Sequence, residues 1–388
     1  MPSRTRSRIL HYTSGGKTTY KFWSPTYLNG PYAGLTGYTG ATSWQEVQDS
    51  YGPRPWPIRS FVSTRRYSEP LVVNGDYNGT YKEIWEEYKP PNRANYAYCP
   101  TITPINWDYW RTKALANINP NKPEVDIPVF IAELRDLPRM LAQAVRLLRG
   151  RATKADLAGS YVAYSFGWAP LISDIGKMLK LQALIAKRVQ YLKKAASKKG
   201  NRVKRQLGTN TIDRPGYSYQ LSWLNSPPSI KGRATVTEVQ KVWFTAQLQL
   251  IGQLPANNAA YQAAASAAVI GSRFSVSTLW EAMPWSWLMD YFVNIGDILE
   301  AGRGGIPYHV SNMCIMAESI VHDRVGEWSH TSGLQCTGGS LTTHVKQRSV
   351  SYQPMPMLSM RPFFTKHMAG ILASIAASRS LGGRTVAR

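Results

Sequence analysis

The histidines are the first candidates for catalysis or metal binding, and their spacing argues against both roles. Five of the six follow residue 305, and none belongs to an HxxxH or HExxH pattern of the kind that holds zinc. They are His11, His309, His322, His330, His344 and His367. We therefore expect no metal site and no nucleophilic chemistry at any of them.

Carboxylates are the next candidates, because a pair of them can act as general acid and base. Four lie on one predicted helical segment, namely Glu281, Asp290, Asp297 and Glu300. The sequence indicates no cleft that would bring two of them together, so we expect helix capping or pairing with the basic helices. Glycine-rich residues 302–305 and 382–383 lack the P-loop lysine spacing and are interpreted as turns. Neither an enzyme nor a cofactor is expected.

Cysteine usage excludes a disulfide framework. The three cysteines are Cys99, Cys314 and Cys336, none is in a CxxC pair, and the spacings are wide. A structural zinc site is not expected either. This pattern is typical of synthesis in a reducing compartment.

The charge of the chain points to a polyanion as partner. The net charge is +23, and the segment from residue 135 to residue 205 holds seventeen Lys or Arg but only three acids. A surplus of this size favours nucleic acid, an anionic membrane surface or an acidic protein. The candidate RNA-binding residues are Arg146, Arg149, Arg151, Lys154, Lys177, Lys180, Lys187, Arg188, Lys194, Lys198, Lys199, Arg202, Lys204 and Arg205.

A solvated helix face normally mixes both signs, because opposite charges four residues apart support the helix. Here the acids are missing, so an anionic partner would remove the self-repulsion. The chain is also rich in Tyr (22) and Trp (13), whose rings stack on unpaired bases and favour RNA over duplex DNA. An ordinary solvated face and a membrane-surface helix remain as alternatives. The membrane-surface helix is less favoured, because the face of the helix opposite the lysines lacks Trp and Phe anchors.

Helices are predicted around this cluster. Residues 129–148 have apolar positions at three- and four-residue steps, with Asp126 as a candidate N-cap and a kink at Pro138. A second helical stretch runs from about 153 to 199, with an interruption around Pro170. When the residues after that proline are projected on a helix at 100° per residue, they form two faces. The apolar face holds Leu171, Ile175, Met178, Ile185, Val189 and Leu192, and the basic face holds Lys177, Lys180, Lys187, Arg188, Lys194 and Lys198. Lys193 projects toward the apolar side.

Strands and further helices are predicted elsewhere. Residues 8–12, 18–23, 59–64 and 306–354 are strand-like, and Ala246, Leu248 and Leu250 alternate with polar residues. Helices are expected at 258–270, at 276–301 with a break near Pro284, and at 363–380. The uncharged residues 242–272 are too polar for a membrane span, and no apolar segment follows basic residues 1–9 as a signal peptide requires.

The order of these elements predicts an elongated α+β protein with a β-sheet-rich region and a separate helical bundle, each built from discontinuous segments. The β-rich region comprises residues 1–125, 203–255 and 305–358. The helical region comprises residues 126–202, 256–304 and 359–388. Breaks are predicted at residues 90–92 and 119–123, and the second is the preferred boundary.

Three ordered segments carry a family resemblance. The first is LAGS at 157–160 followed by FGWAPLISDI at 166–175; the second is RQLGTN at 205–210. The third is LWEAMPWSWLMDY at 279–291, continuing to GDILE at 296–300. Together they resemble the maturation protein, or A protein, of the single-stranded RNA bacteriophages. The likeness covers roughly residues 155–302, and residues 1–120 show none.

The same motifs also have a physical interpretation. The apolar side chains of the first segment are predicted to form a buried seam of the central helices, and three tryptophans of the third are predicted to face it. Pro170 and Pro284 allow changes of helix direction. The seam residues are Phe166, Trp168, Leu171 and Ile175, and the facing tryptophans are Trp280, Trp285 and Trp287.

The resemblance implies a function. Maturation proteins are present as a single copy in the virion, replace a coat-protein dimer in the shell, bind the genomic RNA including its 3′ region, and attach the particle to a bacterial pilus for genome entry. It implies synthesis in the host cytoplasm, RNA bound by the helical part, and a β-rich part that projects outward as the receptor-binding region. Membrane insertion is not expected, although some relatives cause host lysis. The alternatives are a cellular RNA-binding assembly factor, a nuclease and a membrane-active lysis protein.

Overall fold

A computed structural model describes most of the chain. The described residues are 4–12, 19–23, 32–34, 42–51, 58–77, 80–86, 102–134, 141–142, 145, 149, 164, 168–221, 230–252, 258–271, 275–283, 286–329, 334–362 and 365–382. Strands and helices are both extensive in these ranges, so the predicted α+β class is confirmed.

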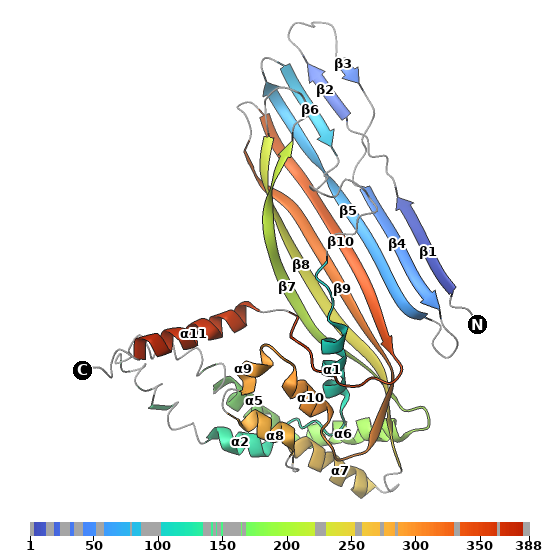
Figure 1. Cartoon of the computed structure of the whole chain (residues 1–388), viewed down its shortest axis with the longest axis vertical. Coiled ribbons are helices and arrows are strands. Elements are labelled where there is room, and N and C mark those ends of the chain that lie inside the picture. The colour runs from blue at the N-terminus through green and yellow to red at the C-terminus, as the bar shows by residue number, and fades with distance from the viewer. Residues whose placement is uncertain are drawn as a thin grey trace. The chain divides into compact units, whose positions relative to one another are not determined.

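A 10-stranded sheet contains all the named strands. They are β1 (Arg4–Tyr12), β2 (Thr19–Trp23), β3 (Tyr32–Gly34), β4 (Thr42–Tyr51), β5 (Ile58–Tyr77), β6 (Thr80–Glu86), β7 (Asn201–Leu221), β8 (Ile230–Leu250), β9 (Tyr308–Ser329) and β10 (Leu334–Ser351). The order across the sheet is β3-β2-β6-β5-β10-β9-β8-β7, and β1 is joined through β4 to β5 (Figure 1). The strand-like stretches predicted from the sequence all fall in this sheet.

Strand β5 joins strands that come from distant parts of the chain. One of its edges pairs antiparallel with β4 and then with β6. The other edge pairs antiparallel with β10, where Arg65 lies opposite His344. Local pairings with β4 and β6 and a long-range pairing with the last strand of the chain therefore meet at β5.

The long strands bury one face by strict alternation. From Ala234 to Leu248 every second residue of β8 is buried, which confirms the alternation predicted at Ala246 and Leu248. Two of the buried positions are polar, and they are hydrogen-bonded. The Glu238 carboxylate accepts from the Thr103 hydroxyl at 2.8 Å and pairs with Arg214.

In β9 the alternation changes phase at one residue. Val310 is buried, but from Met313 onward the described odd-numbered residues of the strand are buried, with Cys314 buried as well. Between them Asn312 has a left-handed φ of 55°, and its amide donates to the Tyr352 carbonyl at 3.3 Å. Asparagine tolerates this conformation better than most residues. The local irregularity at Asn312 therefore shifts the alternation of buried and exposed residues by one position.

The described helices are α1 (Trp107–Ile118), α2 (Ile127–Leu134), α5 (Ala169–Met178), α6 (Leu181–Ala196), α7 (Asn258–Ile270), α8 (Val276–Ala282), α9 (Ser286–Asp290), α10 (Ile295–Ala301) and α11 (Lys366–Gly382). None of the helices in the described ranges is long and apolar enough to cross a bilayer. Helix α7 has the predicted bounds, and α11 lies within two or three residues of its predicted position.

Three helix predictions have different outcomes. The break near Pro284 is present, but the segment is divided a second time, between α9 and α10. Helix α5 begins at Ala169 with Pro170 in its first turn, and most of the predicted helix before it lies outside the described residues; an interruption that was not predicted falls at Leu179 and Lys180. Of the predicted helix 129–148, α2 accounts for the start, and most of the remainder, with Pro138, lies outside the described residues. The Asp126 cap is confirmed, since its Oδ1 accepts from the Val129 amide at 3.4 Å.

Helix α1 was not predicted, because it lies in a Tyr- and Trp-rich stretch interpreted as strands. Its N-cap is Asn106, whose side chain accepts from the Tyr109 amide at 3.1 Å. Trp110, Ala114 and Ile118 are buried to 2% exposure or less. The cap fixes the start of the helix, and burial of this face stabilises it.

The chain forms two compact units, each assembled from three segments. Unit 1 comprises Met1–Ile105, Gln206–Trp243 and Cys314–Val350. Unit 2 comprises Asn106–Arg205, Phe244–Met313 and Ser351–Arg388. The described helices all belong to unit 2, and the predicted basic stretch of residues 135–205 lies entirely within it.

Candidate nucleic-acid interface

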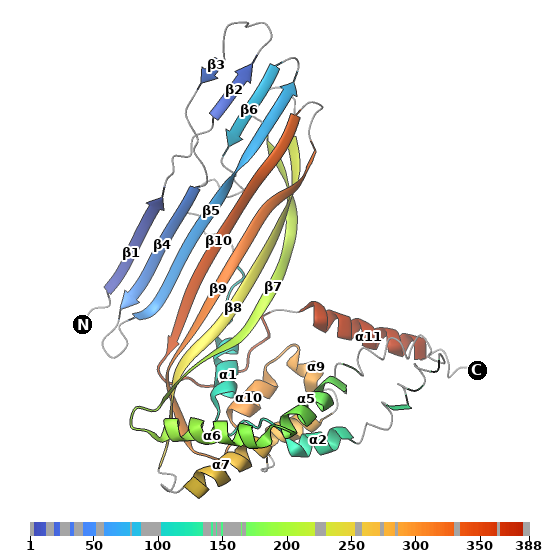
Figure 2. The ribbon, with the colours of Figure 1, turned by 180° about the vertical axis from the view of Figure 1, so that it is seen from behind.

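Helix α6 carries the centre of the basic stretch and has two distinct sides. Leu192 and Ala195 are fully buried, and the helix packs against α7 (Figure 2). Lys187 and Lys194 are exposed. These two lysines are seven residues apart, so they project in the same direction about 10 Å apart along the axis. The helix contains no acidic residue, so its exposed side carries positive charge alone.

The chain leaves α6 through a turn that holds two more lysines at the surface. Gly200 has a left-handed φ of 66°, and its amide donates to the Ser197 carbonyl at 2.8 Å. A Cβ at this position would lie 2.7 Å from the Leu248 carbonyl oxygen, so the turn requires glycine. Lys198 and Lys199 are exposed in this turn.

The first residues of β7 extend the same charge. Val203 is buried, and its neighbours Arg202 and Lys204 are exposed, as the alternation of a strand demands. Arg205 is also exposed, and its Nη1 donates to the Asn117 carbonyl at 2.6 Å. Its guanidinium therefore has a fixed position while remaining accessible.

These residues form a continuous helix–turn–strand segment of one sign. We call it the α6–β7 basic surface, and it consists of Lys180, Lys187, Lys194, Lys198, Lys199, Arg202, Lys204 and Arg205, all exposed. Cations presented at a surface without intervening acids can contact successive phosphates of a nucleic acid.

Arg188 does not belong to this surface. Its position on the predicted basic face placed it among the candidate RNA-binding residues, but its side chain is in the interior. It donates to the carbonyl oxygens of Pro120 and Lys122 at 2.8 and 2.9 Å, and to the Glu124 carboxylate at 3.0 Å. Burial lowers the pKa of the guanidinium, and Glu124 opposes that shift.

The helical spacing explains this correction. Arg188 lies four residues before Leu192 and seven before Ala195, so it belongs to the buried stripe. Its hydrogen bonds hold α6 against residues 120–124, which follow α1. The spacing to Leu192 was the signal that could have identified an interior arginine.

Two other lysines have local partners. Lys193, predicted to project toward the apolar side, is exposed; its Nζ donates to Asn258 Oδ1 at 2.7 Å and lies 6.0 Å from the centre of the Tyr261 ring. Lys177 pairs with Asp174 at 2.8 Å, which offsets its charge. Asp174 therefore offsets the charge of Lys177, whereas neutral Asn258 and Tyr261 hold the position of Lys193 without offsetting its charge.

The remaining candidate residues precede α5. Arg149 is exposed, in a turn, whereas Arg146, Arg151 and Lys154 lie outside the described residues.

The prediction that the first motif forms a buried seam is wrong at Ile175. Ile175 is 46% exposed, as are its neighbours Ile172 and Leu179 at 62% and 84%. Trp168 and Trp280 are half-buried. The other predicted members, Phe166, Leu171, Trp285 and Trp287, have no described side chains. Among the described residues, nothing covers this stripe of α5, so the motif does not have the core role predicted for it there.

The acidic residues of the third motif have structural partners. Asp290 accepts from the Gly296 amide at 2.8 Å and from Trp280 Nε1 at 3.2 Å, which holds the α9–α10 connection. Glu300 pairs with Arg303 at 3.3 Å, and Arg303 pairs in turn with Asp126 at 2.9 Å. Asp290 therefore holds a helix connection and Glu300 pairs with a buried arginine, so neither of these two acids pairs with the basic helices.

The buried Arg303 joins the ends of three helices. Its Nη2 also donates to the Thr278 hydroxyl at 3.0 Å. Asp126 precedes α2, Thr278 lies in the first turn of α8, and Glu300 lies in the last turn of α10. The cluster is surrounded by protein and offers no open pair of carboxylates for catalysis.

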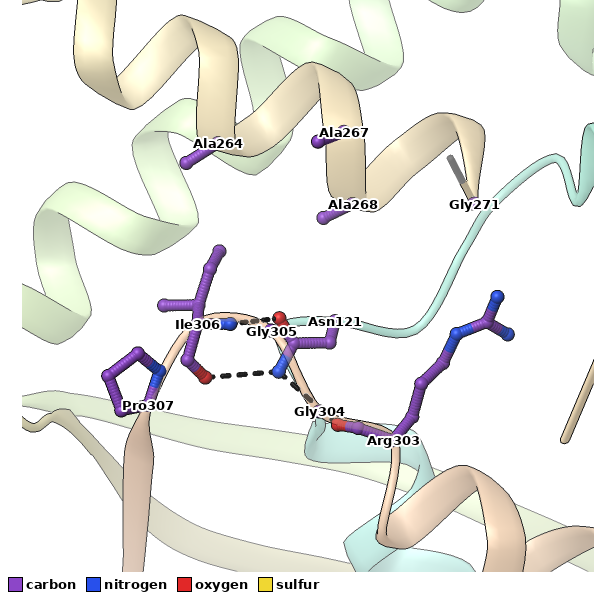
Figure 3. A pocket seen from close by; sticks show the side chains of 10 residues that line it. All are labelled: Asn121, Ala264, Ala267, Ala268, Gly271, Arg303, Gly304, Gly305, Ile306 and Pro307. Carbon is purple, nitrogen blue, oxygen red and sulfur yellow. Dashed lines mark hydrogen bonds between the residues drawn. The ribbon is translucent and has the colours of Figure 1, made fainter. Parts of the chain in front are cut away.

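Next to this cluster is a cavity of 190 Å³ between α7 and the loop 303–307 (Figure 3). The helix contributes Ala264, Ala267, Ala268 and Gly271. The Asn121 side chain fixes the loop, accepting from the Ile306 amide at 2.6 Å and donating to its carbonyl at 3.0 Å. The polar groups of the Asn121 side chain are therefore hydrogen-bonded, and the alanine side chains of α7 have no reactive group.

Metal-binding groups are not evident in the part of the chain that the structure describes. No group of three or more His, Cys, Asp or Glu side chains there could hold an ion. Cys314 and Cys336 are buried free thiols. His322 Nδ1 lies 3.2 Å from the Thr342 hydroxyl, an ordinary surface contact.

Comparison with known proteins identifies the chain. A family model described as phage maturation protein matches residues 129–323, which include the α6–β7 basic surface and Arg303. No curated protein matches the chain significantly.

Proposed function

Because the chain belongs to the phage maturation protein family, a family of structural proteins, we propose that it is a virion component that binds the genomic single-stranded RNA of its phage through the α6–β7 basic surface. The observation that carries the proposal is the run of exposed cations from α6 into β7 without an acid among them. Such a run gives affinity for a phosphate backbone without reading sequence.

Three lysines of the α6–β7 basic surface, in α6 and at its N-cap, test this proposal directly. Lys180, Lys187 and Lys194 succeed one another at seven-residue steps and are exposed. Replacing all three with glutamate removes three phosphate contacts. We expect weaker RNA binding and a plot of log K against log salt that is shallower by about 2, since each contact to a single strand contributes about 0.7.

A matched control separates this effect from the net charge. Lys231, Arg233 and Lys241 are exposed on β8 in unit 1, and their replacement by glutamate changes the charge equally. The control variant should keep most of the wild-type salt slope. An unchanged slope in the α6 variant, or equal losses in both, would show that the RNA binds elsewhere.

The proposal includes the other roles of the family. The single virion copy would replace a coat dimer and engage the 3′ region of the genome. The elongated arrangement expected from the sequence would assign RNA to the helical region (126–202, 256–304, 359–388), with Arg146, Arg149, Arg151 and Lys154 as additional contacts. The β-rich region (1–125, 203–255, 305–358) would then attach the particle to a pilus. The interior Arg188 is left out of the proposed interface.

Rival functions predict different results. A cellular RNA-binding assembly factor would bind RNA but would not purify with virions at one copy each. A nuclease would cleave RNA in the presence of Mg²⁺, whereas we expect no cleavage. A membrane-active lysis protein would release dye from liposomes. Quantitative mass spectrometry of purified particles, with these two assays, distinguishes the four possibilities.

A further inference from the structure

The open face of the sheet in unit 1 has a polar hollow of 460 Å³ between β5 and β10. It is lined by Ser63, Arg65 and Tyr67 of β5 and by Thr342, His344 and Lys346 of β10. The two strands pair so that Lys346 lies opposite Ser63, His344 opposite Arg65 and Thr342 opposite Tyr67. Because alternate residues of a strand share a face, the register brings all six side chains to one side.

The opposite face of the same strands is the buried one. Thr64 on β5 is 3% exposed, and Thr343 and Val345 on β10 are 0% and 1% exposed. In contrast, Tyr67 is 43% exposed, and the Lys346 side chain is 53% exposed. The hollow is therefore accessible to a ligand, and its floor is a packed sheet.

The charges around the hollow are mostly positive. Arg65 and Lys346 carry positive charge, and Glu318 of β9 is paired with Lys346 at 3.2 Å. Burial lowers the pKa of His344, opposed by Glu318 and supported by His322, Lys346 and Arg65. The lowered pKa keeps His344 largely neutral at pH 7, and the ring becomes a third cation as the pH falls.

We propose that this hollow is an oxyanion-binding site for a carboxylate presented by an acidic protein segment. Arg65 and Lys346 supply the charge, and the hydroxyls of Ser63, Tyr67 and Thr342 supply donors for the remaining oxygen lone pairs. The inference rests on the proposed attachment role only for the identity of that segment, namely an acidic patch of the receptor.

Two observations favour a carboxylate over a nucleic-acid backbone. The Glu318–Lys346 pair shows that a carboxylate oxygen fits against the lysine of the hollow. The cations are also confined to a single hollow, whereas a nucleic acid needs a run of them along its backbone, as on α6 and β7. The two surfaces therefore differ in pattern as well as in place along the chain.

The test measures anion binding by the purified full-length chain. A fluorescent peptide rich in glutamate is titrated at low salt, with its glutamine counterpart as the reference ligand. We expect binding of the first alone, and loss of affinity of at least about tenfold when Arg65 and Lys346 are both replaced by glutamine. The control variant, Arg233→Gln with Lys241→Gln on β8, makes the same charge change two strands away and should bind normally.

A variant that is expected to bind more tightly shows that a loss of binding in the other variants is not caused by misfolding. Glu318→Gln removes the internal competitor of the ligand, so affinity should rise severalfold with thermal stability unchanged. Binding should also strengthen between pH 7.5 and pH 5.5, because protonated His344 adds a positive charge while glutamate stays ionised. His344→Gln should remove most of this pH dependence. Weaker binding by Glu318→Gln would overturn the proposal.

Competition identifies the ligand class. Inorganic phosphate at millimolar concentration should displace the peptide, which supports the shared oxyanion chemistry. Phosphate binding without peptide binding would overturn the assignment to a protein segment. A short single-stranded RNA that binds here more tightly than the peptide, and is lost with Arg65 and Lys346, would assign the hollow to nucleic acid instead. If peptide binding fails while pilus attachment persists, the inference falls and the proposed function stands.

Discussion

Adjacent residues on α6 have opposite roles although both are basic. Lys187 is exposed with no acid near it on the helix, and Arg188 is buried with two carbonyl groups and Glu124 as partners. Arginine suits the interior position because its planar guanidinium satisfies several acceptors at once. Charge alone therefore does not mark an RNA contact, and the partners of each cation decide its role.

Substitutions at this pair should separate stability from RNA binding. Arg188→Gln leaves buried carbonyl groups without donors, so we expect the free energy of unfolding to fall by about 2–4 kcal/mol. Lys187→Gln should change stability by less than about 0.5 kcal/mol and weaken RNA binding. Urea unfolding followed by circular dichroism, with RNA binding of the folded variants, provides both values. Equal stability of the two variants would contradict the interior role of Arg188.

At the scale of elements, Asp126 has two tasks that one substitution can separate. It caps α2 through the Val129 amide and pairs with Arg303 beside α8 and α10. Asparagine is as good an N-cap as aspartate but carries no charge. A difference between Asp126→Asn and Asp126→Ala therefore isolates the cap from the ion pair.

We expect Asp126→Asn to lower the free energy of unfolding of unit 2 by about 3 kcal/mol. This value is at the low end of the cost of breaking a buried ion pair, because Glu300 still pairs with Arg303. Asp126→Ala should cost about 1 kcal/mol more through loss of the cap. Thermal unfolding and amide exchange of α2 measure the two effects. Asp126→Asn with wild-type stability would mean that the Arg303 cluster contributes little.

The sequence predicts elements whose signals are local and misses those that depend on distant partners. Helix α7 is delimited correctly by its alanine-rich composition, and Pro284 correctly predicts a break. The second break, between α9 and α10, depends on Asn294, whose side chain binds the Met357 carbonyl and the Ser359 amide at 3.0 and 2.8 Å. No local pattern reveals that pairing. The same holds for the sheet hollow, which exists only because β5 meets β10.

At the scale of the whole molecule, the basic surface depends on segments far from it in the chain. Residues 106–205 contain all of the α6–β7 basic surface, but α6 packs against α7, which lies outside this range. A fragment of residues 106–205 should therefore be largely unfolded and bind RNA with little helix content. Far-UV circular dichroism and limited proteolysis test this, and a compact, protease-resistant fragment would show that the segment folds alone.

The pairing of β5 with β10 has a consequence for biosynthesis. Strands β4 and β6 are made close to β5 in time, so one edge of β5 is covered soon after it leaves the ribosome. The other edge must wait for β10, which follows about two-thirds of the chain's length later. At ordinary translation rates the wait lasts roughly tens of seconds, during which a strand edge is open to wrong partners. We expect nascent chains that end before β10 to be bound by host chaperones and to be released once β10 emerges.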